Sequence, residues 1–247
     1  MNLLSEIEKK SSTGRKMLGV LVDPDKSDDK ACELLARQAS KAGVDFFFYG
    51  SSLLMGNDFE QGIPILKQSN IPLILFPGNG MQISDKADAI LFLSLISGRN
   101  PDMLIGRHVL AAPHLRKSKL EIIPTGYMLV DSGSPTSVSY MSGTTPIPHD
   151  KPDIAACTAL AGEMLGLRMM YLDAGSGARY TVSAEMTRQV KAVIRVPLIV
   201  GGGIRNPEKA YEICRAGADV IMVGNALEKN PELLTEISAA VHSLQAI

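Results

Sequence analysis

Short, continuously apolar segments alternate with amphipathic stretches along the whole chain. The apolar segments lack the polar alternation of half-exposed strands, as is typical of parallel strands that are covered on both faces. The amphipathic stretches between them predict helices. Strands are predicted at residues 17–22, 44–49, 71–76, 89–93, 125–130, 169–172, 197–200 and 220–223. Helices are predicted at residues 30–42, 101–116, 155–165, 184–193, 207–216 and 231–244.

Three of the predicted helices open with the dipeptide Asn-Pro, at residues 100–101, 206–207 and 230–231. The asparagine side chain can accept a hydrogen bond from a free N–H group of the first helical turn. Proline presets the backbone at the first helical position, where no N–H donor is needed. The dipeptide therefore marks three helix starts.

Eight strands that alternate with helices in 247 residues predict an α/β fold, namely a (β/α)₈ TIM barrel. One unit is irregular, because residues 77–88 begin with a proline and two glycines and leave little room for a helix. We therefore expect a modified barrel whose third helix is irregular or missing. No linker divides the chain, so residues 1–247 are assigned to a single domain. The alternative is an open doubly wound sheet, but its phosphate-binding loop normally follows the first strand, whereas the glycine-rich segments here come late.

Composition narrows the class of protein further. The net charge is −1, so no basic surface for a polyanion is indicated and nucleic acid is not an expected partner. Three widely spaced cysteines, Cys32, Cys157 and Cys214, are interpreted as small buried residues in a reducing compartment. The N-terminal segment is amphipathic and charged rather than a signal peptide, and the apolar runs are too short to span a bilayer. A cytoplasmic location is predicted.

Glycines cluster where two neighbouring strands are predicted to end, at residues 201–203 and at Gly224-Asn225. In a TIM barrel, the loops after strands 7 and 8 commonly form a phosphate site at the working face. Glycine allows backbone N–H groups to approach an anion closely. The sequence thus predicts a phosphate-binding site, which many barrel families share and which by itself names no reaction.

Polar residues follow several other strands at the same face. Asp23 follows strand 1 and Ser52 follows strand 2, so their oxygens could hold Mg²⁺, although a turn or helix cap is an equally simple role for Asp23. Asp173 ends strand 6 and could accept a proton or orient a polyol. Tyr127 lies within strand 5, and periodicity does not decide whether it points inward or outward. Residues 133–148 form a long polar loop, which predicts a lid or binding element.

The four histidines, His108, His114, His149 and His242, are scattered, and we interpret them as surface or structural residues.

Taken together, six segments resemble the geranylgeranylglyceryl phosphate synthase family and its PcrB-like bacterial relatives. The sequences at residues 76–79 and 171–178 resemble the second of the two sequence groups of this family. The segments occur in the right order over nearly the whole chain, namely residues 21–26, 49–52, 126–130, 171–178, 201–205 and 223–225. The resemblance implies a barrel without a regular third helix. It also implies a prenyltransferase that joins geranylgeranyl diphosphate to the 3-hydroxyl of sn-glycerol 1-phosphate in ether lipid synthesis.

Residue roles can be carried over by position from the same resemblance. Asp23 and Ser52 would hold Mg²⁺ against the diphosphate, and Asp173 and Tyr127 are the candidate catalytic residues. Asp173 departs from the glutamate that is more common in the family, so it could orient the glycerol rather than take its proton. The implied glycerol phosphate site comprises Tyr171, Leu172, Asp173, Ala174, Gly175, Ser176, Gly177, Gly202, Gly203, Gly224 and Asn225.

Alternatives differ in substrate or in activity. The same transferase could use a longer donor such as heptaprenyl diphosphate. A sugar-phosphate aldolase or isomerase is disfavoured because no lysine lies within a predicted strand for a Schiff base. A phosphate-binding barrel without catalysis is the third alternative. The family commonly assembles, so a homo-oligomer is expected, together with transient contact with a membrane to collect the donor.

Overall fold

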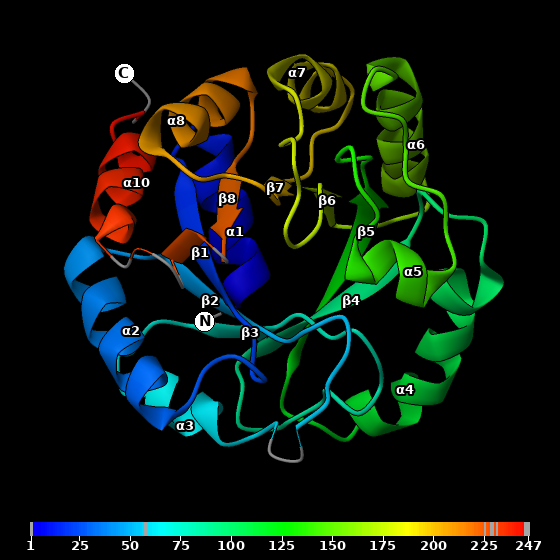
Figure 1. The fold of residues 1–247 in the computed structure, drawn as a ribbon. Helices are drawn as coiled ribbons and strands as arrows, with labels where there is room; N and C mark the ends of the chain where they lie inside the picture. Colours follow the sequence, from blue (N-terminus) through cyan, green and yellow to red (C-terminus); the bar gives the residue numbers. More distant parts are fainter. Residues whose placement is uncertain (1, 57–58, 225, 228–229, 231, 245–247) are drawn as a thin grey trace.

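The computed structural model is a closed barrel of eight parallel strands in the order of the sequence (Figure 1). The structure describes residues 2–56, 59–224, 226–227, 230 and 232–244. The strands are β1 (Met17–Val22), β2 (Phe46–Tyr49), β3 (Leu73–Leu75), β4 (Ala89–Leu95), β5 (Glu121–Leu129), β6 (Met169–Asp173), β7 (Leu198–Gly201) and β8 (Val220–Val223). Because β1 pairs with both β2 and β8, the sheet closes. The predicted TIM-barrel class is confirmed.

An outer ring of helices covers the barrel (Figure 1). It consists of α2 (Asp29–Ala42), α3 (Gly62–Lys67), the π-helix η1 (Asp102–Gly106) with α4 (Arg107–Leu115), α6 (Pro152–Met164), α7 (Ala184–Val193), α8 (Pro207–Ala216) and α10 (Leu233–His242). The short helix α5 (Ser137–Ser142) lies inside this ring, beside β5 (Figure 1). The sequence prediction missed α3, α5 and the N-terminal helix at residues 3–12, described below. The helices α3 and α5 have only six residues each, which is too short for helical periodicity to be visible.

The ring is open after β3. Residues 76–88, all of which the structure describes, run to β4 in turns and bends without a helix. The gap lies between α3 and α4 in the lower part of Figure 1, where loops replace a covering helix. The expectation of a missing third helix is therefore correct: the unit of β3 has no covering helix, whereas β4 is followed by η1 and α4.

Two apolar cores follow from the alternation of side chains along the strands. Leu91, Tyr127 and Tyr171 belong to the core inside the barrel. Ile90 and Leu172, which neighbour two of them in sequence, belong to the larger core between the strands and the helices. Every strand thus contributes to both layers, which explains why its sequence is continuously apolar.

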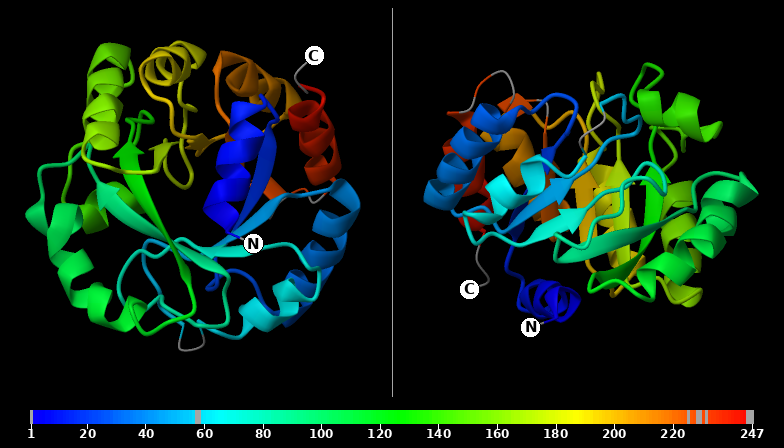
Figure 2. Two further views of the ribbon diagram at one scale, coloured as in Figure 1. Left: turned by 180° about the vertical axis from the view of Figure 1, so that it is seen from behind. Right: turned by 90° about the horizontal axis from the view of Figure 1, so that it is seen from below.

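The helix α1 (Leu3–Ser12) closes the N-terminal end of the barrel, at the opposite end from α5 (Figure 2). Leu3, Leu4 and Ile7 are buried with the inner core. The Glu121 carboxylate accepts hydrogen bonds from the N–H groups of Leu3 and Leu4 at 2.6 and 2.8 Å. A carboxylate at a helix N-terminus is also favoured by the helix dipole. Because α1 closes the N-terminal end, the interior of the barrel is open only toward the C-terminal ends of the strands.

The predicted helix starts at Asn-Pro and the predicted burial of the cysteines are confirmed only in part. Asn206 caps α8 by accepting from the Lys209 N–H group at 2.8 Å. Asn100 accepts from the N–H group of Asp102, but the helix there begins with a π turn rather than an α turn. The third signal includes Pro231, which lies outside the described residues. Cys157 is exposed on α6, so the interpretation of all three cysteines as buried is wrong for this residue.

No helix within the described residues is long and apolar enough to span a membrane.

Candidate functional site

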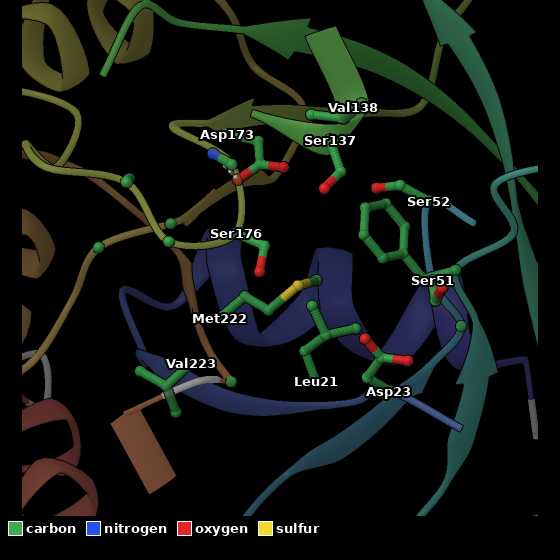
Figure 3. Close-up of a pocket in the computed structure, with 18 of the residues that line it drawn as sticks. Leu21, Asp23, Ser51, Ser52, Ser137, Val138, Asp173, Ser176, Met222 and Val223 are labelled. Carbon is green, nitrogen blue, oxygen red and sulfur yellow. Dashed lines mark hydrogen bonds between the residues drawn. The ribbon is translucent and has the colours of Figure 1, made fainter. Parts of the chain in front are cut away.

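A cavity of about 350 Å³ opens at the C-terminal end of the barrel and is lined by residues that follow β1, β2, β6, β7 and β8. Figure 3 shows Asp173 and Ser176 on one side of this cavity and Asp23, Ser51 and Ser52 on the other. The barrel therefore brings together polar groups that are about 150 residues apart in sequence, such as Asp23 and Ser176, because the C-terminal ends of parallel strands meet at one face.

A buried hydrogen bond in the cavity joins Tyr127 and Asp173. The Tyr127 hydroxyl donates to Asp173 Oδ2 at 2.6 Å, and Asp173 Oδ1 accepts from the Gly175 N–H group at 2.8 Å. Asp173 is 6% exposed and Tyr127 is 5% exposed. The orientation of Tyr127, which the sequence left open, is thus inward, toward the carboxylate at the end of the neighbouring strand.

Burial controls the protonation of this pair. It raises the pKa of the Asp173 carboxyl, and hydrogen bonds, chiefly from Tyr127 and Gly175, offset only part of the effect. Burial and the nearby Asp173 charge also hold the pKa of Tyr127 and of Tyr171 well above the ordinary value of tyrosine. The phenols therefore remain protonated donors, while Asp173 is a stronger base than an exposed carboxylate. Such a group suits proton abstraction from a hydroxyl near neutral pH.

The glycine-rich loops form the floor beside this pair. Gly175, Ser176, Gly177, Gly203 and Gly224 all line the cavity.

Gly202, which also lines the cavity, interlocks the loops after β6 and β7. Its φ is +83°, and a Cβ atom there would lie 2.7 Å from the Gly175 nitrogen and 2.8 Å from the Ala174 nitrogen. Only glycine fits this approach, which leaves a wall of backbone groups at the position predicted for phosphate.

Two predicted members of the glycerol phosphate site have side chains that pack away from the cavity, and a third lies outside the described residues. Leu172 is fully buried in the core between strands and helices, so its side chain points away from the cavity. Ala174 also packs into that core, and its N–H group donates to the Gly201 carbonyl at 3.1 Å. Asn225 lies outside the described residues. Tyr171 does line the cavity, and its hydroxyl donates to Met222 Sδ at 3.2 Å.

Asp23 and Ser52 line the opposite side of the cavity. Asp23 Oδ1 accepts from the Asp25 N–H group at 3.2 Å, and Lys26 Nζ lies 3.2 Å from Asp23 Oδ2. The Asp25 carboxylate is occupied, because it accepts from the N–H groups of Met55 and Gly56, both at 2.7 Å. Asp23 is thus both a turn residue and a carboxylate that faces the cavity.

The oxygen chemistry of Asp23 and Ser52 fits Mg²⁺, which commonly takes one or two protein oxygens and completes its shell with waters and substrate phosphates. Within the described residues no group of three His, Cys, Asp or Glu side chains could hold a metal ion. A metal held by protein ligands alone is therefore not indicated there. A metal that depends on the diphosphate for its remaining ligands is compatible with this donor set.

Some cavity residues were not singled out from the sequence. Ser137 and Val138 come from α5, within the loop that was expected to act as a binding element. Arg205 also lines the cavity and donates to the Ala178 carbonyl at 2.6 Å. The length of the loop after β5 predicted a binding element there, and Arg205 belongs to the motif after strand 7. Neither feature of the sequence shows which side chains face the cavity.

An apolar groove extends from the cavity through the gap left by the missing helix. Its inner part shares Ser52, Phe76 and Tyr127 with the cavity, and its outer part runs between β4 and α4 past Phe92 and Leu115. Tyr127 lines the cavity and both parts of the groove. The polar site and the apolar groove therefore meet at this residue.

Two residues of α4 give the groove polar features. Arg107 Nη1 donates to the Gly78 carbonyl at 2.8 Å, across the groove. His108 is buried against the Phe92 ring, with Nε2 3.2 Å from Ser94 Oγ. Burial lowers the pKa of His108, which keeps the imidazole neutral beside the apolar lining.

The model of the PcrB family matches residues 13–242 of this chain. The chain is 58% identical over 230 residues to a protein of Spirosoma linguale named geranylgeranylglyceryl phosphate synthase, covering 93% of this chain and 92% of that protein. A protein of the same name from Chitinophaga pinensis is 52% identical over 240 residues, covering 97% of this chain and 95% of that protein.

The fold also matches a solved structure of (S)-3-O-geranylgeranylglyceryl phosphate synthase from Thermoplasma acidophilum in complex with its substrate sn-glycerol-1-phosphate. The TM-score is 0.92 at 34% identity, and the match covers 98% of this chain and 99% of that one. With a family model that spans most of the barrel and relatives this similar over nearly their whole length, the chain belongs to the PcrB family.

Proposed function

We propose that this protein transfers the geranylgeranyl group of geranylgeranyl diphosphate to the 3-hydroxyl of sn-glycerol 1-phosphate. The products are geranylgeranylglyceryl phosphate and diphosphate. The observation that carries this proposal is the position of Tyr127, with its Asp173 partner, where a polar cavity meets an apolar groove. A reaction between a polar acceptor and a long apolar donor needs such a junction. The names of the relatives agree with this activity.

In the proposed reaction, the acceptor phosphate lies against the glycine loops after β6, β7 and β8. Backbone N–H groups there can bind its oxygens. Anchoring the phosphate orients the 3-hydroxyl. The entropy that the acceptor must lose to reach the reactive geometry is then lost on binding rather than in the chemical step. The loops are rigidly related because Gly202 packs directly on the backbone of the β6 loop.

Bond changes at the reacting centre are assigned to the Asp173–Tyr127 pair. The bond between the first prenyl carbon and the diphosphate oxygen breaks, and diphosphate leaves with the electron pair. The acceptor oxygen forms the new ether bond to that carbon, and its proton passes to the Asp173 carboxylate. Tyr127, protonated, holds Asp173 in place through the 2.6 Å hydrogen bond.

We assign Mg²⁺ to Asp23 and Ser52 as the cofactor of this reaction. When bound, it would neutralise the charge that develops on the leaving diphosphate. Asp23 supplies a carboxylate and Ser52 a hydroxyl on the side of the cavity opposite Asp173 (Figure 3). The apolar groove begins on the same side. The diphosphate and the prenyl tail of the donor would therefore bind in adjacent parts of the site.

The prenyl tail is assigned to the groove. Phe92, Leu93 and Leu115 line it, and burial of apolar surface there would favour the donor by about 25 cal/mol per Å². Leu53, Met55 and Met81 are exposed on the loops after β2 and β3. We propose that these side chains make the transient contact with a membrane from which the donor is collected, and that the protein acts in the cytoplasm as a homo-oligomer.

Product formation tests this function directly. The protein is incubated with sn-glycerol 1-phosphate, geranylgeranyl diphosphate and Mg²⁺, and the prenyl ether phosphate is sought by mass spectrometry. Metal-dependent product that is lost with EDTA is expected, with heptaprenyl diphosphate a poorer donor in competition. Failure to form product with either donor would refute the transferase function and leave a phosphate-binding barrel.

A further inference from the structure

Gln82 is completely buried in the segment that takes the place of the third helix. Its Oε1 accepts hydrogen bonds from the N–H groups of Ser51 at 3.0 Å and Gly78 at 3.3 Å. Its Nε2 donates to the Ser51 carbonyl at 2.8 Å. One side chain therefore satisfies both backbone groups of Ser51 and connects the loops that follow β2 and β3.

Gly78 adds a steric constraint to this connection. A Cβ atom on Gly78 would lie 2.2 Å from the Ser51 carbonyl oxygen and 2.9 Å from the Ser52 carbonyl oxygen. The two loops are thus in direct backbone contact, with Gln82 bonded to both. In a regular barrel unit, a helix after β3 would support this part of the mouth. Here a buried carboxamide provides the support.

We propose that Gln82 is a positioning residue for the donor diphosphate, because it fixes the loop that carries Ser52. This inference rests on the proposed function, in which Ser52 and Asp23 hold the diphosphate with its metal. A binding group has to be held within about 0.5 Å of its productive position by the residues behind it. Ser52 makes up its side of the cavity next to Ser51 (Figure 3), whose backbone Gln82 holds.

The acceptor half of the site is built from different elements. Its glycine loops follow β6, β7 and β8 and are held by their own contacts, such as the approach of Gly202 to the Gly175 nitrogen. Loss of the Gln82 carboxamide should therefore weaken the donor side selectively. Loss of folded protein, by contrast, lowers the active fraction without changing either KM.

The test is the substitution Gln82→Met in the full chain, which keeps the length of the side chain and removes its three hydrogen bonds. We expect the KM for geranylgeranyl diphosphate to rise at least tenfold, while the dissociation constant of sn-glycerol 1-phosphate stays within twofold. Calorimetry with inorganic diphosphate and Mg²⁺ should show a similar loss of affinity without any turnover. Hydrogen exchange of the peptide that contains Ser51 should become faster.

Ser84→Ala is the matched control. Ser84 is 3% exposed in the same segment, but its hydroxyl is 2.5 Å from Glu60 Oε1, away from the Ser51 backbone. This variant should loosen the segment and leave the affinity for diphosphate within twofold. If Gln82→Met does not fold, Gln82→Asn keeps a neutral carboxamide on a side chain one methylene shorter, and we expect a smaller loss of diphosphate affinity.

A double-variant comparison identifies the route of the effect. If Gln82 acts through Ser52, adding Gln82→Met to Ser52→Ala should change diphosphate affinity by less than twofold. Fully additive losses, an unchanged donor KM, or equal losses of donor and acceptor affinity would each overturn the inference. Absence of product from the wild type with every donor would instead refute the proposed function, and the diphosphate calorimetry would still report on Gln82.

Discussion

The two oxygens of the Asp173 carboxylate have different partners, the Tyr127 hydroxyl and the Gly175 N–H group. This arrangement fixes the orientation of the carboxylate at the end of β6 while burial makes it more basic. In the proposed reaction it is the proton acceptor. These two partners place the short side chain of the aspartate.

Asp173→Asn removes the base while the carboxamide keeps the size of the side chain. We expect kcat to fall by about 10²–10⁴, the usual contribution of a general base, with a smaller loss of affinity for sn-glycerol 1-phosphate. Asp131→Asn is the control, because Asp131 is exposed just after β5 and accepts from the Gly133 N–H group in a similar turn. Steady-state kinetics and calorimetry would measure both. Equal loss of affinity without a separate loss of kcat would make Asp173 a binding residue.

Tyr127→Phe should change the pH dependence of the reaction. The hydrogen bond from Tyr127 lowers the pKa of Asp173, so its removal raises that pKa further. At low pH the carboxyl is protonated and cannot act as a base, so kcat falls. The pH at which this fall occurs should therefore be higher in the variant. Tyr180→Phe, at an exposed position, is the control. A profile that does not move would show that Tyr127 has no influence on the catalytic carboxyl.

At the scale of elements, the loss of one helix creates the groove and a π-helix shapes its wall. The π-helix η1 precedes α4, and Met103 in η1 and Arg107 at the start of α4 both line the groove. Short π segments occur often at functional sites because they change which residues share a helix face. Further along α4, His108, Ala111 and Leu115 continue the same wall.

Ala111→Phe tests the groove as the site of the prenyl tail. Ala111 lines the outer part of the groove, whereas the neighbouring Ala112 is exposed on α4. The larger ring should fill the outer groove and lower kcat/KM for geranylgeranyl diphosphate at least tenfold, a change of about 1.4 kcal/mol. The shorter farnesyl diphosphate should be affected less.

Ala112→Phe provides the comparison for any general effect of a phenylalanine on α4. It should leave the preference between the two donors unchanged. Competition assays with both donors would measure the ratio directly. An unchanged ratio in Ala111→Phe, with the protein folded, would place the tail outside this groove.

At the scale of the whole molecule, the same arrangement of hydrogen bonds, called here the aspartate bracket, occurs three times at the N-terminal face of the barrel. Asp45, Asp88 and Asp219 each precede a strand, and each exchanges two hydrogen bonds with a residue at the start of a neighbouring strand, namely Leu18, Leu73 and Leu198 respectively. A lysine pairs with each carboxylate, namely Lys10, Lys67 and Lys191. The bracket stabilises the face opposite the site and leaves the catalytic loops free of it.

Asp45 gives this bracket a pH dependence. Burial alone would raise the pKa of its carboxyl, but hydrogen bonds from His242, the Leu18 N–H group and Lys10 outweigh it and lower the pKa. The ionised form therefore stabilises the fold above the ordinary pKa of 3.8, and this stabilisation is lost as the pH falls through the lower pKa of the folded state.

Asp45→Asn should accordingly lower the free energy of unfolding by about 1.5–3 kcal/mol at neutral pH, as expected for lost hydrogen bonds to a charged group. The difference from wild type should shrink in acid. Denaturant unfolding across the pH range would measure it. Asp88→Asn, whose side chain is 35% exposed against 6% for Asp45, should cost less. A difference that stays constant with pH would contradict the role assigned to the Asp45 charge.

The sequence by itself determined the barrel, the gap after β3 and the face on which the site lies. These features depend on local patterns: apolar runs for covered strands, a proline and two glycines where no helix forms, and glycines or carboxylates at strand ends. The short helices α3 and α5 escaped detection because six residues do not show a period.

Only the tertiary structure decided which side chains meet. Tyr127 and Asp173 are 46 residues apart, and whether they face each other depends on the register between β5 and β6. The same holds for Leu172, which the closed sheet turns away from the cavity, and for Gln82, whose partner Ser51 is 31 residues distant. The local sequence predicts where each strand lies, but because the strands are apolar on both faces, it does not show which face points into the barrel. Closure of the barrel decides this.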